Sequence, residues 1–367
     1  MNISIFKRLI KIYIIITKTF GKWISPIITG FVLSILRIII GLFRNLDKII
    51  FYKAFKYRLK KPILIVGNPR SGTTFLHRYL VNNKFGVGSQ LWQMIYPSIL
   101  LQKLLKPLLP FLEKVSPARH HSTAAHKTSL QSVETDDVAL FFRYLDGFFL
   151  YGFILSWSEE NLFDWVDPKK RNTSIRDYNW FESIWLRNQY LANHNRTVGK
   201  LFSLSANLPN FLNHFSDSKI LYIIRDPLSV IPSGLSLVTG VLDKKFGFWD
   251  QPLERRTNFI QNLYKGLVEL LLRFESDWTN NKIDRSKVKI IPFDRMMNDF
   301  ENLMIEIIDF VDHPLSKNLK QNIKDTSDKQ RSFQSGHKYD LKKFGLTKEQ
   351  ILNDCEPIYN TFLKNKI

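Results

Sequence analysis

Residues 62–80, PILIVGNPRSGTTFLHRYL, constrain the fold of this chain more than any other segment. The apolar run Ile63–Val66 has the length of a buried strand, and residues 75–81 continue with helical spacing. Gly67 and Gly72 bracket the loop between them. A strand, a glycine-bracketed loop and a helix form a cradle for an anion, because loop N–H groups and the positive end of the helix dipole converge there.

The loop differs from that of a nucleotide-hydrolysing enzyme at one position. Gly67 and Gly72 match the glycines of G-x-x-x-x-G-K-[ST], but Thr73 stands at the lysine position. Arg70 offers a positive charge from inside the loop, and its planar guanidinium suits phosphate or sulfate. We therefore predict an anion site rather than a turn without a ligand, and the absent lysine argues against a standard ATPase.

A second segment predicts another phosphate contact. The apolar run Lys219–Ile224 reads as a strand that ends in Arg225, and Pro227 suits the first turn of a following helix. Ser233 follows Arg225 by eight residues, about two helical turns. Ligands of open α/β sheets bind at the carboxyl ends of strands, so an arginine and a serine can share one phosphate here.

Together, the two segments resemble the sulfotransferases that use 3′-phosphoadenosine-5′-phosphosulfate (PAPS). PRSGTTFLH is similar to their 5′-phosphosulfate loop, and RDPLSVIPS to their 3′-phosphate element. The likeness is to the bacterial PRSGTT branch and extends from about residue 40 to the end. It implies PAPS as the co-substrate, no metal and a hydroxyl acceptor. The donor-binding residues that it implies are Arg70, Ser71, Gly72, Thr73, Thr74, Lys200, Arg225, Ser233 and Arg331.

Looser matches extend the resemblance. Lys200 lies in TVGKLFS, where the family has a lysine on a strand, and residues 133–137 resemble an acidic P-E-E-D-E stretch. Residues 337–341 and 344–347 resemble a C-terminal H-x-Y-x-L…F-G-L-T motif.

These motifs do not identify the general base. Cytosolic members have a histidine shortly after the matching lysine, whereas KLFSLSANL contains none. Glu134 is our first candidate, His337 the second and His126 the third, with Arg70 neutralising the transferring group. The alternative for Glu134 is an acid that complements a helix N-terminus. The alternative for His337 is closure over the nucleotide together with Arg331.

Strands that alternate with helices predict an α/β domain over residues 59–367, with a P-loop-like parallel sheet and helices on both faces. Predicted strands are 63–66, 197–203, 219–224 and 288–293; predicted helices are 75–81, 136–156, 180–193, 206–215, 228–241, 255–278, 294–311 with Asp294 as cap, and one from Thr347. The apolar connection 85–130 is long enough to cover an acceptor, or to pack in the core.

The basic segment 1–58 is predicted to be helical and separate. Residues 1–61 contain thirteen Lys or Arg and one acid, so they hold +12 of the net charge of +20. Lysines recur on one helical face, Pro26 is expected to end or bend the helix, and an apolar run of 14 residues follows from Trp23. We favour helices that lie in a membrane interface; a single span, which would bury Arg37, and simple packing on the domain are the alternatives.

The remaining features bound the location and the partners. One cysteine, Cys355, excludes an internal disulfide, and no short apolar core ends in a cleavage site for a signal peptide. We predict a cytoplasmic enzyme at the membrane face, with no nucleic-acid partner. The expected acceptor is a hydrophobic alcohol such as a sterol or lipid. A carbohydrate acceptor, a kinase-like enzyme with a degenerate loop, and a scaffold without activity are the alternatives.

Overall fold

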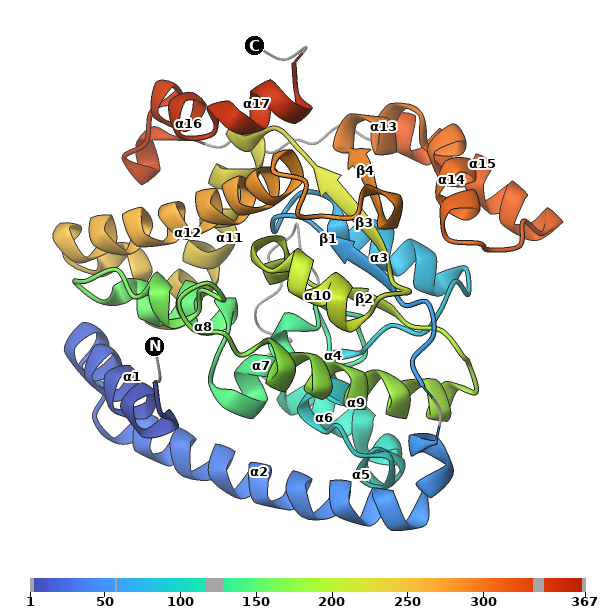
Figure 1. The fold of residues 1–367 in the computed structure, drawn as a ribbon. Helices are drawn as coiled ribbons and strands as arrows, with labels where there is room; N and C mark the ends of the chain where they lie inside the picture. Colours follow the sequence, from blue (N-terminus) through green and yellow to red (C-terminus); the bar gives the residue numbers. More distant parts are fainter. Residues whose placement is uncertain (1–2, 57, 117–127, 333–339, 365–367) are drawn as a thin grey trace. The chain divides into compact units, whose positions relative to one another are not determined.

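The computed structural model describes residues 3–56, 58–116, 128–332 and 340–364 (Figure 1). The chain divides into two compact units. The first comprises residues 1–59, 88–195 and 235–266, and the second residues 60–87, 196–234 and 267–367. Helices α11 (Pro227–Phe246) and α12 (Leu253–Thr279) each have residues in both units.

The second unit contains a four-stranded parallel sheet in the order β2-β1-β3-β4 (Figure 1). Its strands are β1 (Ile63–Val66), β2 (Val198–Lys200), β3 (Lys219–Ile224) and β4 (Val288–Pro292), and its helices α3 (Thr73–Asn82), α10 (Leu208–His214), α13 (Phe293–Asn298), α14 (Phe300–Phe310), α15 (Lys317–Ser332), α16 (Lys348–Asp354) and α17 (Glu356–Phe362). In the register of the sheet, Ile65 lies opposite Lys200 and Val66 opposite Tyr222. The segments that follow β1, β2 and β3 therefore leave the sheet at the same end, the carboxyl end of its strands.

Helices cover both faces of this sheet, as predicted. One face packs against α3, α14 and α15, and its strand residues are Ile63, Ile65, Val198, Leu221, Ile223 and Ile291. Alternate strand residues point to the opposite face. There the Tyr222 ring stacks on Phe274 of α12, with ring centroids 3.4 Å apart. The predicted α/β class with a parallel sheet is confirmed.

Two predicted helices are interrupted. The stretch 136–156 forms α7 (Asp137–Tyr144) and α8 (Phe148–Phe153), because Leu145 takes a left-handed conformation with φ 46°. The stretch 294–311 forms α13 and α14, which separate at Asp299, and Pro292 rather than Asp294 is the N-cap. By contrast, Thr347 caps α16 as expected, since its side chain accepts a hydrogen bond from the Gln350 N–H.

The first unit is helical in its described residues. It contains α1 (Ile5–Phe20), α2 (Ile24–Ile50), α4 (Leu91–Ile95), α5 (Ile99–Leu105), α6 (Leu109–Val115), α7, α8 and α9 (Ser174–Ala192). Gly21, in the left-handed conformation, ends α1. Pro26 therefore does not end that helix: it lies in the first turn of α2, where its missing N–H leaves no bond unmade.

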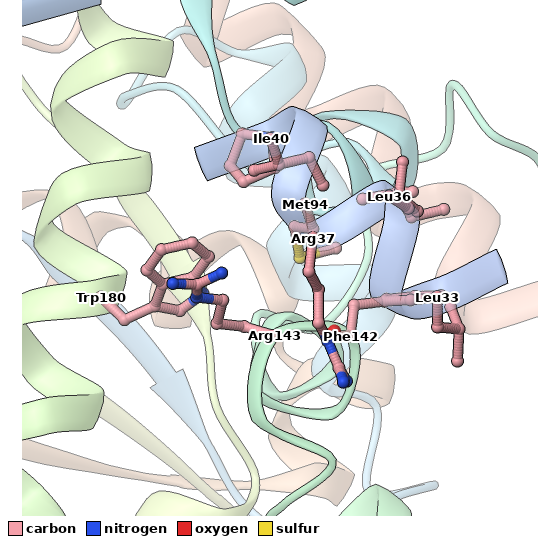
Figure 2. Close-up of a pocket in the computed structure, with 10 residues that line it drawn as sticks. Leu33, Leu36, Arg37, Ile40, Met94, Phe142, Arg143 and Trp180 are labelled. Atoms are coloured by element: carbon pink, nitrogen blue, oxygen red, sulfur yellow. Dashed lines mark hydrogen bonds between the residues drawn. The ribbon is translucent and has the colours of Figure 1, made fainter. Parts of the chain in front are cut away.

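Three charged side chains of α2, those of Arg37, Arg44 and Asp47, contact other helices and loops of the first unit, whereas many apolar side chains of α2 are exposed. Arg37 donates from Nε to the Phe142 carbonyl at 3.0 Å (Figure 2), and Arg44 donates to the Pro97 carbonyl and the Ser183 hydroxyl. The exposed apolar residues of α2 are Ile24, Ile27, Ile28, Phe31, Val32, Ile35, Ile38, Ile39, Leu42, Leu46, Ile49 and Ile50. Among the described residues, α2 is the one helix long and apolar enough to cross a membrane.

Two lysines of α1 contact other residues of the first unit. Lys11 forms an ion pair with Glu160 at 2.6 Å, and Lys7 lies over the Trp165 ring. Arg8, on the same helix, is buried and donates to the carbonyls of Ile3 and Tyr144. Polar contacts thus hold α1 and α2 to the other parts of the first unit.

Asp47, the single acid of residues 1–61, accepts four of these polar contacts. Its carboxylate is fully buried and accepts hydrogen bonds from the Ser98 hydroxyl and from the backbone N–H groups of Ile99 and Leu100, at 2.9–3.0 Å. Arg187 donates to it from Nε at 3.0 Å. Asp47 therefore neutralises a buried arginine and caps the first turn of α5.

We predict that Asp47→Ala lowers the free energy of unfolding by about 3–5 kcal/mol, because it leaves the buried Arg187 charge without its partner. Urea denaturation of the full chain measures this change. Glu160→Ala is the control from the same unit: it removes an acid that is 65% exposed, so the expected change is small. If Asp47→Ala lowers the free energy of unfolding as little as Glu160→Ala does, the Asp47 contacts do not stabilise the fold.

Candidate functional site

The loop after β1 is shaped by two positions that exclude side chains. Gly67 has φ 140°, and a Cβ placed on it would lie 2.6 Å from the Ile223 carbonyl oxygen of the neighbouring strand. Gly72 has φ 95°, and its Cβ would lie 2.7 Å from Cε of Met296. Both positions favour glycine through their positive φ, and Gly67 also requires it for space, because the Ile223 carbonyl belongs to a strand and cannot move aside.

The residues between these glycines are tied together. The Ser71 hydroxyl and N–H both donate to the Asn68 carbonyl, at 2.7 and 3.1 Å. The Asn68 amide donates to the Leu267 carbonyl at 2.8 Å. Arg70 has φ 75°, a value that residues other than glycine seldom adopt. These contacts hold the loop in a strained conformation, which is typical of a ligand-binding segment.

Helix α3 begins at the end of this loop with a positive terminus. Its N-cap is Gly72, which has no side chain to accept from the first N–H groups of the helix. Thr73 and Thr74 form the first turn, and Lys200 of β2 donates from Nζ to the Thr74 hydroxyl at 3.1 Å. A lysine from the neighbouring strand thus reaches the helix start, although the loop itself has no lysine.

Arg70, Arg225 and Ser233 are joined by hydrogen bonds. Arg70 donates from Nε to the Ser233 hydroxyl at 3.0 Å, and Arg225 donates from Nη1 to the Arg70 carbonyl at 2.8 Å. Ser233 is only 3% exposed, whereas both arginines are half-buried. The Arg225 guanidinium also lies 4.0 Å from the centre of the Phe293 ring. The two predicted phosphate elements therefore meet in one place.

The acid next to Arg225 has other partners. Asp226 accepts from the Tyr359 hydroxyl at 2.6 Å and from the Leu228 N–H at 3.0 Å. Burial and the nearby Asp226 raise the pKa of Tyr359, so that its hydroxyl stays protonated and remains a donor. Helix α11 begins at Pro227, as the sequence predicted.

We call this set of residues, Gly67–Thr74 with Lys200, Arg225 and Ser233, the anion cradle. It combines three cationic side chains, hydroxyl groups and the start of a helix at the carboxyl edge of a parallel sheet. Strand β1 lies between β2 and β3, so the chain leaves β1 in one direction and later returns on its other side. Ligands of open α/β sheets bind at such a switch point.

The other predicted site residues are not part of the cradle as described. Arg331 is exposed on α15 and forms an ion pair with Asp328 at 3.9 Å. Glu134 belongs to the first unit, where it is 6% exposed and its N–H donates to the Ser89 carbonyl. His337 and His126 lie outside the described residues. The donor-binding role of Arg331 and the catalytic roles of Glu134, His337 and His126 remain predictions.

Sequence reasoning missed the supports of the cradle. Asn68, Phe293 and Met296 hold the loop or lie under Arg225, yet none of them was singled out. A signal was available for Phe293, because this aromatic residue directly follows β4 and so lies at the edge where the other strands end.

The fold and the cradle define an α/β protein in which cationic and hydroxyl groups meet at the start of a helix. A family model described as the sulfotransferase family matches residues 62–317, which is more than half of the chain. The chain belongs to the sulfotransferase family and is a transferase. The kinase-like and scaffold alternatives are therefore not supported.

Solved structures share the fold. The sulfotransferase STF1 of Mycobacterium tuberculosis H37Rv is similar with a TM-score of 0.71 and 16% identity, over 96% of this chain and 90% of that one. The sulfotransferase STF9 of Mycobacterium avium is similar with a TM-score of 0.66 and 15% identity, over 87% and 81% of the two chains. No curated protein sequence matches the chain.

We predict that Gly67→Ala destabilises the second unit by on the order of 3 kcal/mol, because it adds a clash with the Ile223 carbonyl to backbone strain. Gly345→Ala is the matched control: Gly345 also has a positive φ, of 64°, but open space around its Cβ, so only about 1 kcal/mol of strain is expected. Urea unfolding compares the two. A loss at Gly67 no larger than that at Gly345 would contradict the close approach.

Proposed function

We propose that this enzyme transfers a sulfuryl group from PAPS to a hydroxyl group of its acceptor. PAPS is the co-substrate that the sulfotransferase family implies. The observation that supports its use here is the hydrogen-bonded arrangement of Arg70, Arg225 and Ser233 beside the start of α3. It brings together donors for two phosphate groups, and PAPS carries its phosphates on the 3′ and 5′ oxygens of one ribose.

The residues of the cradle fit such a ligand. The backbone N–H groups of Ser71–Thr74, at the start of α3, would hold the 5′-phosphosulfate. The positive end of the helix dipole stabilises a negative charge at that place. Arg225 and Ser233 would hold the 3′-phosphate, with a guanidinium fork and a hydroxyl. Gly67 and Gly72 let the loop adopt positive φ angles and pass close to β3 and α13, which sets the course of the backbone around the ligand.

Arg70 and Lys200 would serve the transfer itself. Negative charge builds up on the bridging and sulfuryl oxygens as the bond to the donor breaks, and fixed cations next to these oxygens lower the barrier. Lys200 is 5% exposed and its Nζ lies 3.1 Å from the Thr74 hydroxyl, so its charge is held in place at the helix start. Arg70 is fixed through Ser233.

For the general base we retain Glu134 as first candidate, with His337 and His126 after it. The support for Glu134 is its near-complete burial and its position outside α7, two residues before the N-cap Asp136. A residue outside the helix does not complement the first turn directly; Asp137 occupies that position. A base at Glu134 would accept the proton of the acceptor hydroxyl during transfer.

The test of the function is a titration with adenosine 3′,5′-bisphosphate, the product of the donor. We predict tight binding to the native chain and a loss of about 1.5–3 kcal/mol for Arg225→Ala, because a charged hydrogen-bond donor is removed. Calorimetry measures both. Arg285→Ala, which removes an exposed arginine of the same unit, should bind as the native chain does. Absence of binding to the native chain would reject the function, and unchanged binding by Arg225→Ala would reject that residue's role.

We further propose that the acceptor is a hydrophobic alcohol and that the enzyme works at a membrane surface. The support is the set of exposed apolar residues on α2, together with further exposed apolar residues in the segment 99–115, which are Leu104, Leu108, Phe111 and Val115. Part of the 85–130 connection packs into a hydrophobic cluster, which was the alternative to covering an acceptor. Trp92, Leu109 and Leu130 are buried together, with Leu91, Ile95, Tyr96, Leu105 and Leu112 packed around them.

For the acceptor we predict that, with PAPS and a mixed panel of sterols, lipid alcohols and oligosaccharides, sulfate is transferred to the apolar alcohols. Apolar surfaces select apolar ligands, and such alcohols concentrate in the membrane. Mass spectrometry of the products identifies the sulfated compounds. Sulfation confined to the oligosaccharides would overturn the acceptor class while leaving the transfer reaction intact.

A further inference from the structure

The carboxylate of Asp226 directly follows Arg225 in the chain but is bonded elsewhere. Its Oδ1 accepts a hydrogen bond from the Tyr359 hydroxyl at 2.6 Å and another from the Leu228 N–H at 3.0 Å. In the described part of the chain, no ion pair joins Asp226 to Arg225, whose Nη1 donates to the Arg70 carbonyl at 2.8 Å. The acid and the arginine therefore have different partners, although they are neighbours.

Adjacent arginine and aspartate side chains are able to pair in this protein. In the first unit, Arg176 and Asp177 are also consecutive, and their side chains form an ion pair at 2.6 Å. A guanidinium binds a carboxylate and a phosphate through the same N–H groups. A carboxylate that turned toward Arg225 would therefore compete with a phosphate for this arginine. The direction of the Asp226 side chain thus decides how much of the Arg225 charge is left for an anion.

Tyr359 is held in place by the anchoring of α17 to α12. It is 1% exposed, and its hydroxyl reaches an acid 133 residues away in the chain. Two residues further on, the Thr361 hydroxyl donates to the Glu275 carboxylate of α12 at 2.8 Å. The next ring, that of Phe362, lies 5.9 Å from the Phe274 ring, which also stacks on β3. The C-terminal helix is therefore fixed, through α12, to the strand that leads into the anion cradle.

Asp226 is fixed to the start of α11 by its backbone and by its side chain. Its carbonyl accepts hydrogen bonds from the N–H groups of Ser229 and Val230, and its Oδ1 accepts from the Leu228 N–H. Burial and the nearby Asp226 raise the pKa of Tyr359, so the hydroxyl keeps its proton and acts as a donor. The tyrosine thus adds a second donor that holds the carboxylate on the side of α11.

We propose that Tyr359 is a positioning residue for the 3′-phosphate site: its hydroxyl keeps the Asp226 carboxylate from pairing with Arg225, so that the guanidinium binds the phosphate. The inference rests on the proposed function, because it takes Arg225 as a ligand of the 3′-phosphate. In this role Tyr359 acts through Asp226 and needs no contact with the donor. The C-terminal helix α17 is thereby part of the donor site, although none of the sequence motifs includes Tyr359.

The experiment compares the affinity of the full chain for two nucleotides by calorimetry. Adenosine 3′,5′-bisphosphate has the 3′-phosphate and adenosine 5′-phosphate lacks it, so the ratio of their dissociation constants reports the 3′-phosphate contact. Tyr359→Phe, which removes only the hydroxyl, should weaken binding of the bisphosphate about fivefold to tenfold, because the released carboxylate competes for Arg225. The affinity for adenosine 5′-phosphate should stay the same.

A second substitution separates this role from support of the fold. In the double variant Tyr359→Phe/Asp226→Asn, the amide still accepts from the Leu228 N–H but has no charge to neutralise Arg225, so the bisphosphate affinity should return to the native value. A tyrosine that merely supported the fold would instead show a further loss. Asp226→Asn alone should bind the bisphosphate as the native chain does, and it tests the same claim without a change in α17.

Tyr79→Phe is the matched control, because it removes the hydroxyl of another buried tyrosine of the second unit, one that does not contact Asp226. Both nucleotide affinities should be unchanged in this variant. The urea midpoint without ligand reports whether each variant is folded.

Three results would overturn the positioning role. One is a Tyr359→Phe variant with the native ratio of dissociation constants, whether both affinities fall together or neither changes. Another is a double variant that binds the bisphosphate no better than Tyr359→Phe does. The third is a weakened bisphosphate affinity in Asp226→Asn alone. Failure of the proposed function looks different: the native chain itself would then bind the bisphosphate no more tightly than adenosine 5′-phosphate, before any variant is compared.

Discussion

The parallel pairing of β1 with β3 is the constraint on which the anion cradle depends. The two strands lie in register from Ile63 opposite Lys219 to Val66 opposite Tyr222, so the loop after β1 and Arg225 after β3 leave the sheet side by side. Gly67 passes so close to the Ile223 carbonyl that no side chain fits between them. This close passage turns the loop across the end of β3, where the Arg225 guanidinium reaches the Arg70 carbonyl. A larger residue at Gly67 would separate the two phosphate elements.

The cradle obtains its positive charge from three separate parts of the second unit. Arg70 comes from the loop, Lys200 from the end of β2 and Arg225 from the end of β3. An ATP-hydrolysing loop places its lysine in the motif itself. Here Thr73 stands at that position, and Lys200 reaches Thr74 from the strand paired with β1. The positive charge of the cradle is therefore divided between one loop and two strand ends instead of being placed within a single motif.

Helices α1 and α2 reverse the usual pattern of a soluble surface, in which charged residues are exposed and apolar residues are buried. Arg8 and Asp47 are buried with hydrogen-bond partners, while isoleucines of α2 point outward. Buried charges need partners, and the first unit supplies them through backbone carbonyls, Ser98 and Arg187. Helix α2 therefore exposes many more apolar residues than the isolated ones that are normal on a soluble surface.

The sequence alone determined the strand–loop–helix of the cradle, the arginine and serine after β3, and the parallel α/β class. Each of these depends on local signals: short apolar runs, glycines at fixed spacing and a proline at a helix start. Tertiary structure decided the rest. Helices 136–156 and 294–311 break at Leu145 and Asp299, although their hydrophobic spacing continues. The contacts of Asn68 with Leu267, of Phe293 with Arg225 and of Asp47 with Arg187 join residues far apart in the chain. Periodicity shows that a face is apolar, but not which neighbour covers it, because that neighbour is set by packing between distant segments.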